Sequence, residues 1–221
     1  MATDKRDPQA IDRPTSQQRG RLAGKTAVVT GAAGNLGTEI CRAFAREGAY
    51  VVMTGRTQQR IDAAREALIA ETGVSRDYIE TALMDGADPD SVREALNKVK
   101  AHYGRIDILV NNAGSAGPKQ PLHNIPFSVD EMAACGDTET VGDAVRNIFG
   151  VTWNIARIAA PMMPVGASMV NISTIFSKTR YYGRTAYVVP KAALNALSQE
   201  LADELGPRGI RVNTIFPGPI E

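Results

Sequence analysis

The stretch TAVVTGAAGNLG, residues 26–37, joins an apolar run to a helical pattern through Gly31, Gly34 and Gly37. The run TAVVT is typical of a short buried strand, and apolar residues recur at helical spacing from Leu36 onward. Glycines let the backbone turn sharply and approach a pyrophosphate, whose charge then faces the amides and positive dipole of the helix start. Between a strand and a helix, this turn predicts a dinucleotide-binding site. The alternative is a glycine-rich turn required only for close packing.

Strand and helix patterns continue to alternate along the rest of the chain. Asp88 followed by Pro89 has the form of a helix cap and a first helical residue. Such regular alternation predicts an α/β fold, a doubly wound parallel sheet of the Rossmann-like type with helices on both faces. The expected strands cover residues 26–30, 49–54, about 79–84, 106–112, 169–173 and 210–216.

Size and composition exclude several classes of protein. The 221 residues suit one domain with a sizeable core, and 43% hydrophobic with 22% charged residues is typical of a globular chain. A net charge of +1 offers no field for nucleic acid or a membrane surface, so neither partner is expected. Because no stretch has the apolar length of a membrane span and the start lacks a signal-peptide pattern, a cytoplasmic location is expected.

Two segments lie outside the regular pattern. Residues 1–21 are polar and without periodicity, which predicts a flexible leader. Residues 115–140, SAGPKQPLHNIPFSVDEMAACGDTET, are long for a loop; such loops are often lids or binding loops, and the sequence leaves the role of this insert open. A single helix is expected to follow over 141–162. The two cysteines, Cys41 and Cys135, and two histidines predict no metal site.

A second informative stretch is NISTIFSKTRYYGRTAYVVPKAAL, residues 171–194. Tyr187 and Lys191 are four residues apart, which places them on one face of a helix, and Pro190 is tolerated because the helix is only beginning there. A phenol is a weak acid at neutral pH because its ordinary pKa is about 10, and a neighbouring ammonium favours the ionised form. The pair therefore suits proton transfer, although such pairs also occur by chance. Thr174, after the preceding strand, could place a hydroxyl opposite them.

The end of the second strand bears on the choice of nucleotide. An acidic residue there binds the ribose diol of NAD, whereas an arginine accommodates the 2′-phosphate of NADP. This chain has Arg56 and no acidic residue until Asp62, which favours NADP(H). The planar guanidinium suits phosphate because it donates two hydrogen bonds at once. The alternative is that Arg56 is a solvated surface charge.

Several motifs occur in a fixed order: TGAAGNLG at 30–37, NNAG at 111–114, Asn147, Thr174, YVVPK at 187–191 and PG at 217–218. In this combination the chain resembles the short-chain dehydrogenase/reductase family over residues 22–221. The resemblance implies an NADP-dependent oxidoreductase domain in which Asp85 meets the adenine and Ile220 the nicotinamide amide. It implies catalytic roles for Thr174, Tyr187, Lys191 and Asn147. It implies cofactor contacts by Gly31, Gly34, Asn35, Leu36, Gly37, Arg56, Asp85, Asn111, Ala113, Gly114, Tyr187, Lys191, Pro217, Gly218 and Ile220.

Three features depart from the family pattern. Asn35 stands where the family has the middle glycine of the turn, and asparagine can adopt a left-handed conformation at small cost. Thr174 replaces the usual serine; Ser173 is the neighbouring candidate, but successive strand residues face opposite sides, and Thr174 is preferred. The insert before Asn147 is longer than is usual in the family.

Longer segments are similar to one group within the family, the amino-terminal half of bifunctional malonyl-CoA reductases. These segments are RLAGK, MDGADP, NNAGSAGPKQPL, NISTIFSKTRYYGR and the run from Tyr187 to Glu221. The resemblance implies NADPH-dependent reduction of malonate semialdehyde to 3-hydroxypropionate, with a second reductase half elsewhere in the full-length protein and a homodimer formed through the helices of Asn147 and Tyr187. It also implies that this domain is truncated and lacks its C-terminal strand and substrate lid.

The implied mechanism assigns each side chain a task. Tyr187 gives a proton to the aldehyde oxygen, Thr174 holds that oxygen, Lys191 favours the tyrosinate and binds the nicotinamide ribose, and Asn147 positions a water that resupplies the proton. Because the implied substrate carries a carboxylate, a cation is expected nearby. Arg184 is the best placed, Arg180 and Lys178 are alternatives, and all three could instead be solvated loop residues.

Two other functions stay open at this point. One is reduction of a 3-oxoacyl thioester or another carbonyl. The other is a non-catalytic NADP(H)-binding domain, which would bind the cofactor and oxidise none of it.

Overall fold

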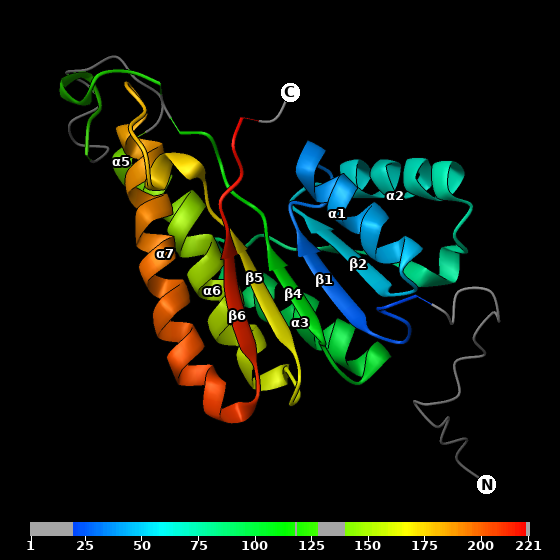
Figure 1. Ribbon diagram of the computed structural model, residues 1–221. Helices are drawn as coiled ribbons and strands as arrows, with labels where there is room; N and C mark the ends of the chain where they lie inside the picture. The colour runs from blue at the N-terminus through cyan, green and yellow to red at the C-terminus, as the bar shows by residue number, and fades with distance from the viewer. Residues whose placement is uncertain (1–19, 118, 128–139, 220–221) are drawn as a thin grey trace, which may run out of the picture.

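A computed structural model describes residues 20–117, 119–127 and 140–219 of the chain. Within them, six parallel strands form one sheet in the order β3-β2-β1-β4-β5-β6 (Figure 1). This confirms the expected doubly wound sheet, and the strand boundaries agree with the sequence prediction to within two residues. The strands are β1 (Thr26–Thr30), β2 (Tyr50–Gly55), β3 (Ile79–Leu83), β4 (Ile108–Asn111), β5 (Ser168–Ile172) and β6 (Arg211–Ile215).

Helices cover both faces of this sheet (Figure 1). One face packs against α1 (Asn35–Arg46) and α2 (Gln58–Thr72), and the other against α3 (Pro89–Tyr103), α6 (Val151–Ala159) and α7 (Thr185–Leu205). The direction of strand addition reverses between β1 and β4, because β2 and β3 extend the sheet on one side and β5 and β6 on the other. In sheets of this type a ligand binds at the carboxyl ends of the strands beside the reversal.

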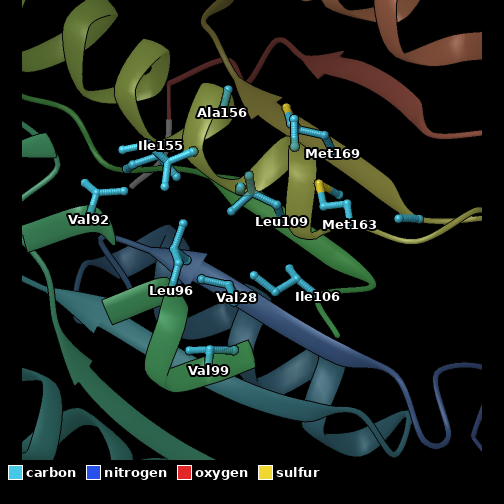
Figure 2. Close-up of a cluster of buried hydrophobic side chains, with 14 of the residues drawn as sticks. Val28, Val92, Leu96, Val99, Ile106, Leu109, Ile155, Ala156, Met163 and Met169 are labelled. Atoms are coloured by element: carbon cyan, nitrogen blue, oxygen red, sulfur yellow. The ribbon is translucent and has the colours of Figure 1, made fainter. Parts of the chain in front are cut away.

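Alternate residues of the central strands supply the two main cores. Val28 of β1 packs with residues of α3 and α6, whereas its neighbours Ala27 and Val29 pack with α1 and α2. Figure 2 shows part of the first core, in which Leu96 and Ile155 converge on the sheet. Each fully buried aliphatic side chain of this kind stabilises the fold by about 1.5–3 kcal/mol relative to exposure. The strand ends next to the reversal are therefore fixed from both faces.

The start of α3 shows how the local sequence sets a helix boundary. Asp88 is the N-cap residue, and its carboxylate accepts a hydrogen bond of 2.9 Å from the amide of Asp90. Pro89 is the first helical residue, where its missing N–H leaves no bond unmade. The predicted cap and first residue are confirmed.

The segment expected to form one helix over 141–162 is more varied. It begins as α5 (Val141–Val145), continues as a wide π turn, η3 (Arg146–Gly150), and returns to the α form in α6. A 3₁₀ turn, η4 (Ala160–Met162), ends it. Single π turns inside helices are frequent at functional sites. Periodicity alone did not reveal this turn, because a π turn shifts the apolar pattern by only one residue.

Several expectations fall outside the described residues. These concern most of the flexible leader (1–19), much of the insert (118 and 128–139, with Cys135), and Ile220. Arg21, at the end of the expected leader, donates its amide to Glu47 Oε2 at 2.8 Å. In the portion of the chain that is described, no helix combines the length and apolarity needed to cross a membrane.

Candidate active site

The glycine turn after β1 is shaped by contacts that exclude side chains. Gly31 has φ +61°, in the left-handed region that favours glycine, and a Cβ there would lie 3.0 Å from the Cα of Ala113. A Cβ on Gly37 would lie 2.3 Å from the carbonyl oxygen of Gly31, which is closer than atoms can approach. Hydrogen is therefore required at both positions if the backbone is to keep this path.

The same turn leaves backbone donors available. The first helical bond of α1 joins Thr38 N to Gly34 O at 2.8 Å, so the amides of Asn35, Leu36 and Gly37 have no acceptor within the helix. Asn35 begins α1, and none of the non-glycine residues described has a positive φ, so this position does not require the left-handed conformation. Free amides at a helix start form a site for an anion such as a pyrophosphate.

The end of β4 is fastened to this turn by Asn112 and Thr30. The Thr30 hydroxyl accepts hydrogen bonds of 2.9 Å from the amides of Asn112 and Ala113, and Asn112 Nδ2 donates to Thr30 O at 2.9 Å. Asn111, expected in the nucleotide cleft, instead points the other way and donates from Nδ2 to Asn171 Oδ1 at 2.8 Å. The cleft is lined by Asn112 because successive residues at a strand end face opposite sides.

A cleft of about 430 Å³ runs along the carboxyl ends of β1, β2, β3 and β4. It is lined by the glycine turn, by Asp85 and Asn147, and by two arginines, Arg56 and Arg60. Arg60 was not singled out from the sequence, although it lies only four residues beyond Arg56, in the first turn of α2 (Gln58–Thr72). Among the residues described, neither guanidinium forms an ion pair, so both are available to an anionic ligand. The Asp85 carboxylate accepts a 3.0 Å bond from the amide of Ala87, which orients it at the cleft wall.

A smaller cleft of about 290 Å³ adjoins the first one. Leu36, Asn112, Gly114 and Ser115 line both clefts, so the two meet at the glycine turn and the end of β4. The smaller cleft is also lined by residues predicted from the second informative stretch and from the carboxyl end. These are Thr174, Tyr187, Lys191, Pro217 and Gly218.

Tyr187 and Lys191 lie in the first turns of α7, as their spacing predicted. Lys191 is 5% exposed, donates from Nζ to Ile172 O at 2.5 Å, and lies 6.0 Å from the centroid of the Tyr187 ring. Burial lowers the pKa of Lys191 to about 8, because a desolvated ammonium is less stable than a hydrated one. An ammonium whose pKa lies this close to neutral pH is well suited to proton-transfer chemistry.

The two candidate hydroxyls before Tyr187 have different bonds. Thr174 Oγ1 accepts a bond of 3.3 Å from the amide of Phe176, and its own proton has no acceptor among the described residues. Ser173 Oγ donates to the carbonyl oxygen of Lys191 at 3.2 Å. Both line the smaller cleft. Thr174 is therefore the hydroxyl whose proton is available to a bound oxygen.

Asn147 and Arg184 lie at different distances from this chemistry. Asn147 lies in the π turn and lines the larger cleft beside Val151 and Ile155. Arg184 lines neither cleft; its Nη1 donates to the carbonyl oxygens of Ala116 and Gly117 at 3.3 Å each. The structure therefore places Arg184 between α7 and the loop after β4.

The cysteine among the described residues, Cys41, is free and buried. Burial raises the pKa of the Cys41 thiol to about 12, so this group stays protonated. In the ranges that the structure covers, no group of three or more His, Cys, Asp or Glu residues could hold a metal ion.

The comparison with known families agrees with this arrangement. The short chain dehydrogenase family model matches residues 25–221, so the chain belongs to that family and is an oxidoreductase of this class. Among solved structures, it is 61% identical, with a TM-score of 0.87, to the N-domain with NADP of a bacterial malonyl-CoA reductase, covering 91% of this chain and 38% of that one. The chain thus spans well under half of that relative.

Two further relatives are less similar to this chain. The 3-oxoacyl-(acyl-carrier-protein) reductase FabG of Thermotoga maritima is 31% identical over 91% of this chain and 76% of that protein. A short chain dehydrogenase of Burkholderia cenocepacia J2315 in complex with NADP is 30% identical, with a TM-score of 0.78, covering 91% of this chain and 77% of that one.

Proposed function

We propose that this chain binds NADPH and reduces malonate semialdehyde to 3-hydroxypropionate, as the amino-terminal reductase part of a malonyl-CoA reductase. The observation that carries the proposal is the 61% identity, over 91% of the chain, to the NADP-bound N-domain of such an enzyme. At this identity the residues that line both clefts are expected to be largely shared.

The larger cleft fits the proposed cofactor. Its glycine turn keeps its path because a Cβ at Gly31 or Gly37 would collide with neighbouring backbone, and the free amides at the start of α1 would hold the pyrophosphate. Arg56 and Arg60 supply two cations for the 2′-phosphate that distinguishes NADPH from NADH. When bound, NADPH supplies the hydride for carbonyl reduction.

The smaller cleft supplies the proton and holds the carbonyl oxygen. Thr174 donates a hydrogen bond from its free hydroxyl to that oxygen, and Tyr187 transfers its phenolic proton to it. The buried ammonium of Lys191 stabilises the resulting tyrosinate and would hold the ribose of the bound cofactor. Asn147, exposed to the larger cleft by the π turn, holds a water that resupplies the proton given up by Tyr187.

The substrate carboxylate requires a cation at the edge of the smaller cleft. Arg184 is proposed for this role, since it lies three residues before Tyr187 at the start of α7. To bind a carboxylate its guanidinium exchanges one of its two long bonds to the Ala116 and Gly117 carbonyls for a charge-assisted bond. A homodimer formed through the helices of Asn147 and Tyr187 completes the proposed assembly.

NADPH oxidation with a panel of carbonyl compounds tests the function. We expect turnover with malonate semialdehyde and none with malonyl-CoA, because the latter needs the second reductase half. Acetoacetyl-CoA tests the alternative suggested by the 3-oxoacyl reductase of Thermotoga maritima. Turnover of acetoacetyl-CoA with no turnover of malonate semialdehyde would replace the proposed substrate by a 3-oxoacyl thioester.

A further inference from the structure

A network of side chains lies behind the smaller cleft and joins the two segments that carry its chemistry. Thr174 is the N-cap residue of a 3₁₀ turn, η5 (Ile175–Ser177), whereas Tyr187 and Lys191 belong to α7. These segments are separate elements, so their relative position depends on the contacts between them.

Ser177 is the centre of this network. Its hydroxyl donates to the carbonyl oxygen of Thr174 at 2.7 Å, and its amide donates to the same oxygen at 3.1 Å. The hydroxyl also accepts a bond of 2.9 Å from Nδ2 of Asn195. Ser177 therefore closes the turn that follows Thr174 and ties that turn to α7.

Asn195 lies on the face of α7 that carries the reactive side chains, one helical turn beyond Lys191 and two beyond Tyr187. On the other side of Thr174, Ser173 Oγ donates to the carbonyl oxygen of Lys191 at 3.2 Å and lies 3.4 Å from Ser177 Oγ. Thr174 is thus flanked by two hydroxyls that both bond to α7.

Asn195 also carries an unmet hydrogen-bonding group. Its Oδ1 is buried and has no hydrogen-bond partner among the described residues. A buried acceptor left in this state lowers the stability of the fold. An apolar residue of similar size would avoid this loss, so stability does not explain the asparagine.

We propose that Ser177 and Asn195 are positioning residues that hold the Thr174 hydroxyl opposite Tyr187 and Lys191, at the expense of stability. The inference rests on the proposed function, in which Thr174 binds the substrate oxygen. Neither residue touches substrate in this account. The bond from Asn195 fixes Ser177, Ser177 fixes the turn, and the turn directs the Phe176 amide that orients the Thr174 hydroxyl.

Asn195→Leu separates positioning from stability. The substitution removes the bond to Ser177 and also removes the unpaired oxygen. We expect kcat for carbonyl reduction to fall about tenfold, because a small displacement of a reacting group has large effects on rate. We expect the NADPH Kd to stay within about twofold and the thermal midpoint to be unchanged or higher. A fall in activity that merely follows a fall in thermal midpoint and in cofactor affinity would indicate a structural role only.

Substitutions at Ser177 provide a second test of the positioning role, and Thr179 provides a matched control. Ser177→Ala should lower kcat about tenfold, and Ser177→Thr, which keeps the hydroxyl, should restore most of it. Thr179 makes a similar bond, from Oγ1 to Ile175 O at 3.2 Å, without a link to α7. Thr179→Val should therefore leave kcat unchanged. Wild-type kcat in Ser177→Ala, or an equal loss in Thr179→Val, would overturn the inference.

The choice of substrate separates this inference from the proposed function. Rates are measured with whichever of malonate semialdehyde and acetoacetyl-CoA the wild-type chain reduces. If it reduces neither, the proposed function fails, and a crystal structure of Ser177→Ala decides the positioning role. Displacement of Thr174 Oγ1 relative to Lys191 is expected; an unmoved turn and hydroxyl would refute the role whatever the substrate.

Discussion

The two clefts meet at the end of β4, yet the larger is formed mainly by backbone and the smaller mainly by side chains. The larger cleft is shaped by backbone: a Cβ at Gly31 or Gly37 would collide with neighbouring backbone, and the Thr30 hydroxyl accepts hydrogen bonds from the two amides that follow β4. The smaller cleft depends on side chains, since Lys191 and Ser173 hold β5 and α7 together through their polar ends. Substitutions in the first should therefore affect cofactor binding, and those in the second should affect the rate of the chemical step.

The largest effect is expected from removing the proposed proton donor. Tyr187→Phe should lower kcat about a thousandfold, because a positioned general acid contributes roughly 10²–10⁴ to a rate. NADPH affinity should change little, because the substitution removes only the phenolic oxygen and keeps the ring that lines the smaller cleft. Steady-state kinetics and fluorescence titration with NADPH measure the two quantities. Retention of wild-type kcat would remove Tyr187 from the mechanism.

A methyl group in the glycine turn should, in contrast, lower mainly the affinity for NADPH. Gly37→Ala places a Cβ 2.3 Å from the Gly31 carbonyl oxygen, so the turn must move. Overpacking of this kind costs about 1–3 kcal/mol, which corresponds to a loss of roughly ten- to a hundredfold in NADPH affinity if the cofactor site absorbs it. Fluorescence titration measures the affinity.

Gly206→Ala is the matched control, because a Cβ at Gly206 meets no atom within 4 Å and its φ of −53° suits any residue. It should leave NADPH binding unchanged. If Gly37→Ala bound NADPH as tightly as wild type, the turn would not require its glycine for the cofactor.

Arg56 and Arg60 are expected to set the preference of the larger cleft for NADPH over NADH. Replacing both Arg56 and Arg60 by Gln should reduce the preference for NADPH over NADH by about ten- to fiftyfold, because charge-assisted bonds to the 2′-phosphate are lost. NADH binding should be unaffected. The ratio of kcat/KM for the two cofactors gives the preference, and Arg157→Gln, an exposed position on α6, serves as control. An unchanged ratio would make Arg56 and Arg60 ordinary surface charges.

The buried ammonium makes the smaller cleft sensitive to pH. Since the pKa of Lys191 is lowered to about 8, its charge is lost as the pH rises through that value. The kcat/KM for NADPH, which reports the free enzyme, should fall about tenfold between pH 8 and pH 9.5. A rate that stays flat to pH 10 would show that the Lys191 charge does not govern this step.

The contribution of Lys191 to stability should change in the opposite direction. Its folded pKa lies below its unfolded value, so burial of the charge destabilises the fold at neutral pH. Between about pH 8 and the unfolded pKa of 10.5, the unfolded chain binds more protons than the folded one, and stability rises with pH. Urea unfolding of wild type and Lys191→Met across this range isolates the effect, which should be absent in the variant.

Features that depend on local sequence patterns could be predicted from the sequence. The six strands, the Asp88 cap of α3 and the glycine turn follow from local patterns, because apolar alternation and glycine spacing act within a few residues. The pairing of Tyr187 with Lys191 followed from helical spacing in the same way.

Features that depend on contacts between distant segments were not predictable. Asn111 was expected in the cleft, but its position at a strand end turns it toward Asn171, and Asn112 takes the place. Ser177 and Asn195 carry no motif of their own, because their connection exists only when η5 packs on α7. The π turn that presents Asn147 likewise leaves no strong periodic signal.

Arg184 combines contacts to backbone with a proposed role for its side-chain charge. Its substitution is expected to have the smallest effect on catalysis. Its guanidinium bonds to backbone carbonyls of Ala116 and Gly117, while its proposed role is to bind a carboxylate. Arg184→Met should raise the KM for malonate semialdehyde about threefold, because a partly solvated ion pair contributes up to about 1 kcal/mol. The KM for an uncharged aldehyde such as propanal should stay unchanged, and Arg180→Met, at an exposed position, should change neither. An equal rise for both aldehydes would mean that Arg184 only holds the loop after β4 against α7, and no change for either would end the anchoring proposal.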